Sequence, residues 1–375
     1  MPTLCGDVIT SPGLGYTINV GSYQSYFQTI HGIESFESAL SLPTSSPLSF
    51  QYRNKLSTNK KFCIYYGFPS MVNGSSTIEQ AVENFALYEI IVFPLVNQFM
   101  YADEFGKFKE IVNHLILRGK KIYGYIQTGA QPINTIYNEM NIWTNNSSKL
   151  ASETLGINEN ITGFFLDEFE IGFGDMSTIK MNQIIDIARN NAISTPLQKQ
   201  YGFILNGFAP TQIFLPSPVG AGIFLQRNGK EFYLAESFGI LDGEEITCSR
   251  NQANFNSFVQ RVNYILELGI QDVTLATTTS ITRNEIVFNQ DLFNEYYYMA
   301  ELLGFAGFFW TEYNFSASNP TMPFYTFTGK PRDFLNEKAD EEINVVDKQG
   351  NPVSNSILIL SIITLLVFLF STPRI

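Results

Sequence analysis

The sequence predicts an α/β protein whose main domain is a closed (β/α)8 barrel of parallel strands. Two observations favour this fold. A short apolar run followed by a stretch with amphipathic-helix spacing recurs along residues 58–330, and eight such units in one domain are typical of this barrel. The apolar runs lack polar alternation, as in strands buried on both faces. A doubly wound open sheet is the alternative, but residues 67–70, after the first strand, do not form its usual Gly-rich nucleotide loop.

Each element follows from its local pattern. The helix expected at 77–88 begins at Thr77, a good N-cap, with Glu79 in its first turn. The helix expected at 105–117 places Phe108, Ile111 and Leu115 on one face. Further helices are expected at 177–190, 255–268 and 289–303. The eight expected strands are 62–66, 90–94, 121–126, 163–166, 202–206, 232–236, 272–277 and 304–310.

The N-terminal extension, residues 1–57, differs from the barrel in composition. It is rich in Ser, Gly, Thr and Tyr, and residues 16–20 alternate like an exposed strand. It has neither a basic segment nor an apolar core near its start, so we expect no cleavable signal peptide. The extension is expected to be a small adaptor or a wrap around the barrel.

The C-terminal segment is strongly apolar. Residues 356–371 carry no charge and are only a little shorter than the ~20 residues of a usual membrane span. We expect a membrane anchor here, with residues 331–355 as a polar stalk and the barrel tethered at a cell or particle surface. Without a signal peptide, that location needs another export route. A buried terminal helix and a removable lipid-anchor signal are the alternatives.

Composition limits the classes of partner and chemistry. The net charge is −12 and only 15% of residues are charged, which argues against binding nucleic acid and suits a neutral polymer such as a polysaccharide. The two histidines, His31 and His114, and the absence of Cys pairs at zinc spacing make a His-built metal centre or a Ser-His-Asp triad unfavoured. We therefore expect no metal and no cofactor. The three cysteines imply no disulfide framework.

Carboxylates and aromatic residues follow the ends of several expected strands. Asp167, Glu168 and Glu170 come after the fourth strand, and Glu236 ends the sixth. Because parallel strands of a barrel end at one face, these acids are expected to converge there. Paired carboxylates with aromatic platforms are typical of glycosyl transfer. The expected catalytic residues are Asp167, Glu168 and Glu236, and the expected substrate-binding residues are Tyr65, Tyr66, Tyr125, Gln127, Asn206, Trp310 and Glu312.

Each of these residues also has a structural interpretation. The acids after the fourth strand can serve as an N-cap or loop acids ahead of the next helix. Tyr65, Tyr66 and Trp310 can fill the barrel, and Asn206 can cap a turn.

Five motifs give a family resemblance: 64–70 (IYYGFPS), 121–125 (KIYGY), 163–169 (GFFLDEF), 234–238 (LAESF) and 308–312 (FFWTE). Together they resemble glycoside-hydrolase-like TIM-barrel proteins related to the spherulation-specific (spherulin-like) family and, more distantly, to endo-α-1,4-polygalactosaminidases. The resemblance covers about residues 61–325. It implies an acid pair from the fourth and sixth strand ends, here Asp167 and Glu236. Alternation along the strand separates Asp167 from Glu168, but it can break near a strand end, so either acid could point inward.

The expected function is hydrolysis of a polysaccharide by paired carboxylates. Asp167 or Glu168 would be the general acid, Glu236 the nucleophile or base, and Glu312 a substrate contact. The alternative is a barrel that binds glycan, or builds a cell or virion surface, without catalysis. A carboxyl separation of roughly 5–10 Å across an open cleft would favour the enzyme.

Overall fold

The fold is a closed barrel of eight parallel strands with helices on its outer side. The computed structural model describes residues 8–11, 16–19, 60–94, 102–144, 157, 160–190, 200–241, 244–246, 252–278, 296–297, 300 and 303–310. Around the barrel the strands follow the order β11-β12-β3-β4-β5-β6-β7-β8, and β8 pairs with β11 to close the ring. Their bounds are β3 Lys60–Ile64, β4 Ile90–Phe93, β5 Lys121–Gln127, β6 Gly163–Asp167, β7 Gly202–Asn206, β8 Glu231–Ala235, β11 Thr274–Thr277 and β12 Gly307–Phe309.

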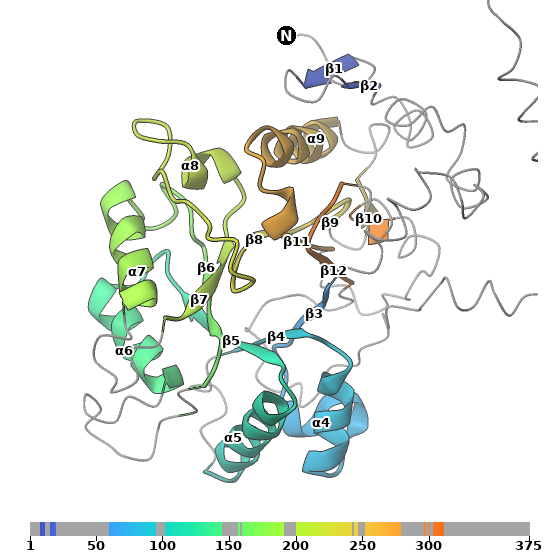
Figure 1. Ribbon diagram of the computed structural model, residues 1–375, viewed down its shortest axis with the longest axis vertical. Helices are drawn as coiled ribbons and strands as arrows, with labels where there is room; N and C mark the ends of the chain where they lie inside the picture. Colours follow the sequence, from blue (N-terminus) through green and yellow to red (C-terminus); the bar gives the residue numbers. More distant parts are fainter. Residues whose placement is uncertain are drawn as a thin grey trace, which may run out of the picture.

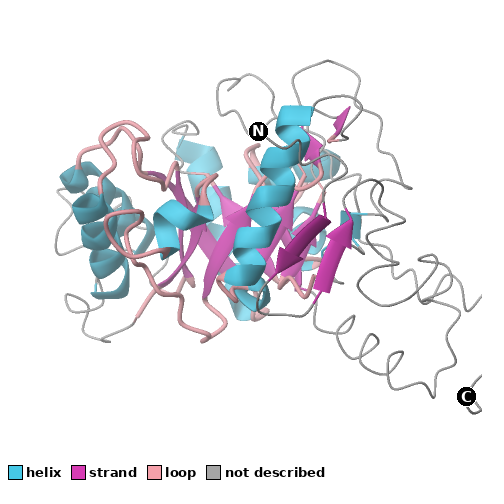
Figure 2. Cartoon of the chain, turned by 90° about the horizontal axis from the view of Figure 1, so that it is seen from above, coloured by secondary structure: helices cyan, strands magenta, loops and turns pink. Residues whose placement is uncertain are grey.

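This arrangement confirms the predicted barrel and all eight predicted strands, with ends shifted by a few residues. Figures 1 and 2 show the strands in the middle of the molecule and the helices around them. The helices are α4 Ile78–Ala86, α5 Ala102–Leu117, α6 Ile133–Thr144, α7 Thr178–Asn190, α8 Pro210–Phe214 and α9 Gln252–Glu267, with 3-10 turns η1 Pro69–Gly74 and η5 Gln271–Val273. Two small antiparallel pairs lie apart from the barrel sheet: β1 Val8–Ser11 with β2 Tyr16–Asn19, and β9 Ile240–Leu241 with β10 Glu244–Glu245.

Local sequence explains several of these elements. Thr77 caps α4 as predicted, because its hydroxyl oxygen accepts a hydrogen bond from the backbone N–H of Gln80. β2, at Tyr16–Asn19, confirms the strand predicted at residues 16–20. The predicted helix at 289–303 lies mostly outside the described residues.

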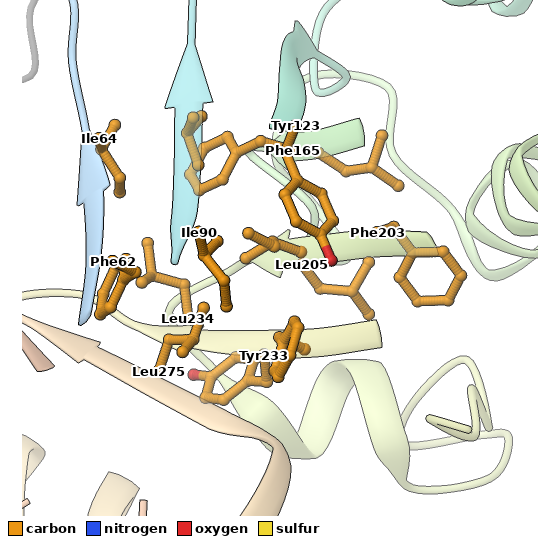
Figure 3. Packing of buried hydrophobic residues seen from close by; sticks show 14 of the residues in the cluster. Phe62, Ile64, Ile90, Tyr123, Phe165, Phe203, Leu205, Tyr233, Leu234 and Leu275 are labelled. Carbon is orange, nitrogen blue, oxygen red and sulfur yellow. The ribbon is translucent and has the colours of Figure 1, made fainter. Parts of the chain in front are cut away.

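The core has two layers, one inside the barrel and one between the strands and the helices. Tyr65 and Phe93 pack their rings on Phe85 of α4, so they lie outside the barrel. Their strand neighbours Ile64 and Val92, in register with Tyr123, therefore point inward. Figure 3 shows part of this buried cluster, with side chains from strands on different sides of the barrel. The filled interior leaves the strand ends as the place for a site.

Gly124 brings α6 close to the barrel. A Cβ atom at this position would lie 2.2 Å from the Trp143 ring, so only glycine lets that ring pack on β5. The Trp143 indole nitrogen donates to the Tyr125 carbonyl at 3.3 Å. The contact fixes α6 beside the end of β5, where the candidate site begins.

Of the two chain ends, the structure describes residues 8–11 and 16–19 near the start and none after residue 310. Within the described residues, no helix is long and apolar enough to span a bilayer. Residues 331–355 and 356–371 lie outside the described residues. The stalk and the membrane anchor therefore stay predictions.

Candidate active site

Asp167 and Glu236 share one hydrogen-bond donor at the carboxyl end of the barrel. The side-chain amide nitrogen of Asn206 donates to Asp167 Oδ1 at 2.7 Å and to Glu236 Oε2 at 3.0 Å. The distance between Asp167 Oδ1 and Glu236 Oε2 therefore cannot exceed the sum of these two hydrogen-bond lengths. The Tyr125 hydroxyl donates to Asp167 Oδ2 at 2.6 Å, so both oxygens of this carboxylate have a partner.

The strand register explains why these residues meet. Asp167 ends β6 in register with Gln127, the last residue of β5, and Asn206 ends β7. Glu236 follows β8, two residues beyond Leu234, the partner of Asn206. Registered neighbours point to the same side of a parallel sheet, so side chains far apart in the sequence lie together at one mouth.

Glu168 reaches the same mouth by a different route. Its backbone has a φ of 56°, in the left-handed region, where the strand's alternation of side chains breaks. The Gln127 amide nitrogen then donates to Glu168 Oε2 at 3.0 Å. Both acids therefore lie at the mouth, and Asp167 is the one that shares a donor with Glu236.

Burial changes the charge states available at the mouth. It raises the pKa of Asp167, against hydrogen bonds from Tyr125 and Asn206 that lower it. Burial also raises the pKa of Glu236, where Asn206 and the charge of Arg261 oppose the rise and Asp167 adds to it. The pKa of Glu168 is raised in the same way. Two half-buried carboxylates this close favour a state in which one of them holds a proton.

Aromatic side chains surround the carboxylates. The Tyr66 ring lies edge-on to Tyr125, with 5.5 Å between ring centroids, and Tyr125 stacks on Phe165. Phe173, 43% exposed, lies beside Gly129 and Glu168. Phe165 is itself buried, whereas Tyr66, Tyr125 and Phe173 keep some exposure and offer apolar faces on which a sugar could stack.

Two of the predicted substrate-binding residues, Tyr65 and Trp310, lie away from the mouth, and a third is not described. Tyr65 is buried against Phe85 of α4, outside the barrel wall, so it is a core residue between strand and helix and does not fill the barrel interior. Trp310 is 6% exposed and follows β12 on the same side as Phe308, which packs on Phe238 outside the barrel. Glu312 lies outside the described residues.

Two charged residues near the mouth were not predicted from the sequence. Burial raises the pKa of Glu139, on α6, to about 7, and its charge is one cause of the raised pKa of Tyr125. Arg261, on α9, is buried, and its charge acts on Glu236. The apolar spacing of Ile136, Met140 and Trp143 was the signal that could have revealed α6 and with it Glu139.

The hydrogen-bond donors to the acids at the mouth are neutral side chains. Among the described residues, no three His, Cys, Asp or Glu side chains are grouped so that they could hold a metal ion. The donors that reach Asp167, Glu168 and Glu236 are the hydroxyl of a tyrosine and the amides of Asn206 and Gln127.

The fold and the site together define an eight-stranded parallel barrel with a carboxylate pair at its mouth. The sequence matches no protein-family profile and is not detectably similar to any curated protein. Among solved structures it is similar to a glycoside hydrolase family 5 enzyme from Prevotella bryantii, at 11% identity over 72% of this chain and 93% of that one, with a TM-score of 0.41.

Two further similar structures differ from each other in function. A Haloferax volcanii malate synthase shows 10% identity over 67% of this chain and 70% of its own, with a TM-score of 0.42. An endo-β-1,4-glucanase from Xanthomonas axonopodis pv. citri shows 11% identity over 81% and 94%, with a TM-score of 0.38. Likeness at this level carries no argument about activity. The barrel part of the predicted resemblance is confirmed by the strand topology, whereas the spherulin-like and polygalactosaminidase relationships stay predictions.

Proposed function

We propose that this protein is a glycoside hydrolase that cleaves the O-glycosyl bonds of a polysaccharide, with Asp167 and Glu236 as its acid pair. The observation that carries the proposal is the single Asn206 amide that bonds to both carboxylates, at 2.7 and 3.0 Å. A pair this close corresponds to the separation of about 5–5.5 Å in retaining glycosidases, rather than the wider gap of inverting ones.

The chemistry then proceeds in two steps. Glu236 attacks the anomeric carbon while the bond to the leaving oxygen breaks, and that oxygen takes the proton of Asp167. Water next attacks the glycosyl ester on Glu236, gives a proton to Asp167 and releases the Glu236 carboxylate. Burial, which raises the pKa of Asp167, favours the protonated acid that the first step needs.

The other residues at the mouth have supporting roles in this proposal. Asn206 and Tyr125 hold the pair in place, and Gln127 holds Glu168. Tyr66 would contribute a sugar-stacking face.

The test is polysaccharide turnover by matched variants. The wild-type protein is incubated with a panel of neutral and amino-sugar polysaccharides, and released reducing ends are measured. Asp167→Asn and Glu236→Gln should each lower turnover by at least about 10³-fold, within the range for a lost acid–base group. Glu110→Gln, the same change at an exposed position on α5, is the control and should leave turnover unchanged. Unchanged turnover in Asp167→Asn and Glu236→Gln would reject the assignment.

Two further readouts refine the proposal. Proton NMR of the first product should show the anomeric configuration of the substrate, and net inversion would contradict the role of Glu236 as nucleophile. Exposed Phe173 beside the acids also suits a barrel that only binds glycan. Binding to the panel without any wild-type turnover would favour that alternative.

A further inference from the structure

Two exposed phenylalanines lie in the segments that follow strands β6 and β7. Phe173 is 43% exposed and comes six residues after Asp167, the last residue of β6. Phe208 is 54% exposed and comes two residues after Asn206, the last residue of β7. A single exposed apolar side chain is normal on a protein surface. Both of these rings, however, are held in fixed contacts next to the acids.

Phe173 lies beside Glu168, the residue after Asp167. A Cβ atom at Gly129 would lie 2.6 Å from Cδ1 of the Phe173 ring and 2.7 Å from Glu168 Oε2, so only glycine leaves room for both. The backbone N–H of Phe173 also donates to the Glu170 carbonyl at 3.3 Å. The ring is therefore held next to a carboxylate of the mouth by close packing and by its own backbone.

Lys180, on α7, fixes the loop on which Phe173 packs. Its side chain is buried, and Nζ donates to the carbonyls of Thr128 and Gly129, at 3.0 and 3.3 Å, and to the carboxylate of Asp175. The backbone N–H of Asp175 donates to the Gly129 carbonyl at 3.2 Å. These contacts join the segment after β5 to the segment after β6, so the fold sets the position of the Phe173 ring.

Arg261, on α9, supports Phe208 in a similar way. Arg261 is 4% exposed, and its guanidinium carbon lies 4.8 Å from the centroid of the Phe208 ring, within the range of a cation–π contact. Its Nη2 donates to the carbonyl of Ser237, the residue after Glu236, at 3.1 Å. The Phe208 ring is therefore fixed beside the peptide that follows Glu236, while much of its surface faces solvent.

Each acid of the pair thus has an exposed ring close to it in the fold. The contact with Gly129 places Phe173 toward β5, on the side of Asp167, and the contact with Arg261 places Phe208 toward the end of β8, on the side of Glu236. Flat rings with an open face and a fixed position suit stacking on the apolar face of a sugar.

We propose that Phe173 and Phe208 are two sugar-binding platforms, one beside each acid, which hold a polysaccharide chain on both sides of the bond to be cleaved. Phe173 binds the unit on the leaving-group side, where Asp167 gives its proton. Phe208 binds the unit on the side that becomes attached to Glu236. The inference rests on the proposed function for the names of these two sides, whereas the binding itself needs no turnover.

The test is affinity electrophoresis of the full chain in native gels that each contain one soluble, uncharged polysaccharide: xyloglucan, galactomannan, mixed-linkage β-glucan or glycol chitin. The wild-type protein should be retarded in at least one gel. There, Phe173→Leu and Phe208→Leu should each raise Kd by about 3–10-fold, the range for a lost ring contact, and the double variant by about the product of the two. Phe173→Tyr and Phe208→Tyr keep the rings and should bind like the wild type.

Phe224→Leu is the matched control, because Phe224 is 67% exposed at the other end of the barrel. Its carbonyl accepts from Arg189, which also binds Glu231 at the start of β8. This variant should leave Kd unchanged, and a rise as large as that of Phe208→Leu would overturn the inference. Unchanged Kd in either mouth variant, or no retardation of the wild type in any gel, would also overturn it.

A second measurement covers a Phe208→Leu variant that does not fold. A single fluorine label on the ring of residue 208 should give an NMR signal that shifts when the retained polysaccharide is added, and an unmoved signal would overturn the inference. Binding that depends on both rings, without any turnover, would reject the proposed function and support this inference. Turnover that is the same in the wild type and in both Leu variants, with equal Kd, would do the reverse.

Discussion

Strand β8 begins at one glutamate, Glu231, and is followed by another, Glu236, and the two have different hydrogen-bond partners. Glu231, at its start, is 1% exposed. It accepts hydrogen bonds from Arg189 Nε at 3.1 Å and Nη2 at 2.7 Å. The backbone N–H of Gln226 also donates to it, at 2.7 Å. Glu236, just past its end, shares the Asn206 amide with Asp167, and burial raises its pKa.

The contrast gives Glu231 a structural role and, under the proposed function, Glu236 a chemical one. A two-pronged Arg–carboxylate contact satisfies the charge of Glu231 and joins α7 to the barrel. At the other end, Asp167 and Glu236 share one neutral donor. Their negative charges are less well stabilised, and the pKa values of both acids are raised. In enzymes with this fold, residues at the start of the strands serve stability and those at the carboxyl end serve the reaction, which is the division that the proposed function expects here.

The largest expected stability effect is at Glu231. Glu231→Gln removes the partner of Arg189 inside the fold and should lower the free energy of unfolding by about 3 kcal/mol. We expect a value at the low end of the destabilisation found when a buried ion pair is broken, because the Arg189 side chain is 24% exposed. Glu236→Gln should lower the free energy of unfolding by less, since Glu236 shares the neutral Asn206 amide and does not make a two-pronged arginine contact. Urea unfolding of both variants measures this, and equal losses would remove the distinction between the two ends.

Much of the barrel could be predicted because its strands are apolar runs buried on both faces. The strand predicted at 163–166 is observed at Gly163–Asp167, and the one predicted at 202–206 at Gly202–Asn206. Helix α6 was not predicted. Its sequence is rich in Asn, and its placement depends on Trp143 packing where Gly124 leaves room, which is a contact between elements.

The site was predictable to the same extent. Asp167, Asn206 and Glu236 end strands, and closure of the ring brings strand ends together. The direction of Glu168 could not be predicted, because it depends on one backbone angle beyond the strand. Arg261 could not be identified either, since a single arginine in an amphipathic helix normally faces solvent.

The next largest expected effect is on kcat/KM and comes from the Asn206 amide that Asp167 and Glu236 share. Asn206→Ala leaves both carboxylates without their common hydrogen bond, and hydrogen bonds to charged groups contribute about 1.5–3 kcal/mol. We therefore expect kcat/KM on a cleaved polysaccharide to fall by roughly 10–100-fold. Asn228→Ala, an exposed asparagine before the start of β8, is the control and should change kcat/KM little. Equal kinetics for the two variants would mean that the amide does not organise the pair.

The smallest effect is the pH dependence of stability that comes from the raised pKa values at and near the mouth. Burial raises the pKa of Glu139 from 4.5 to about 7, so the folded protein holds this proton at pH values where the unfolded chain has released it. Its contribution is therefore fully present below pH 4.5 and is lost as the pH rises through about 7. Asp167 and Glu236, whose pKa values are also raised, act with the same sign.

Glu139→Gln should reduce the change in the free energy of unfolding with pH. Because the side chain is only half-buried, solvent screening reduces the full linkage energy, and we expect the variant to gain about 1 kcal/mol relative to the wild type between pH 5 and pH 8. Urea midpoints measured across this range test the expectation, with Glu110→Gln as the exposed control. A wild-type protein that becomes more stable from pH 5 to pH 8, with Glu139→Gln following it in parallel, would show that the mouth carries no excess of held protons. The difference between the two ends of β8 would then be one of hydrogen-bond geometry and not of charge.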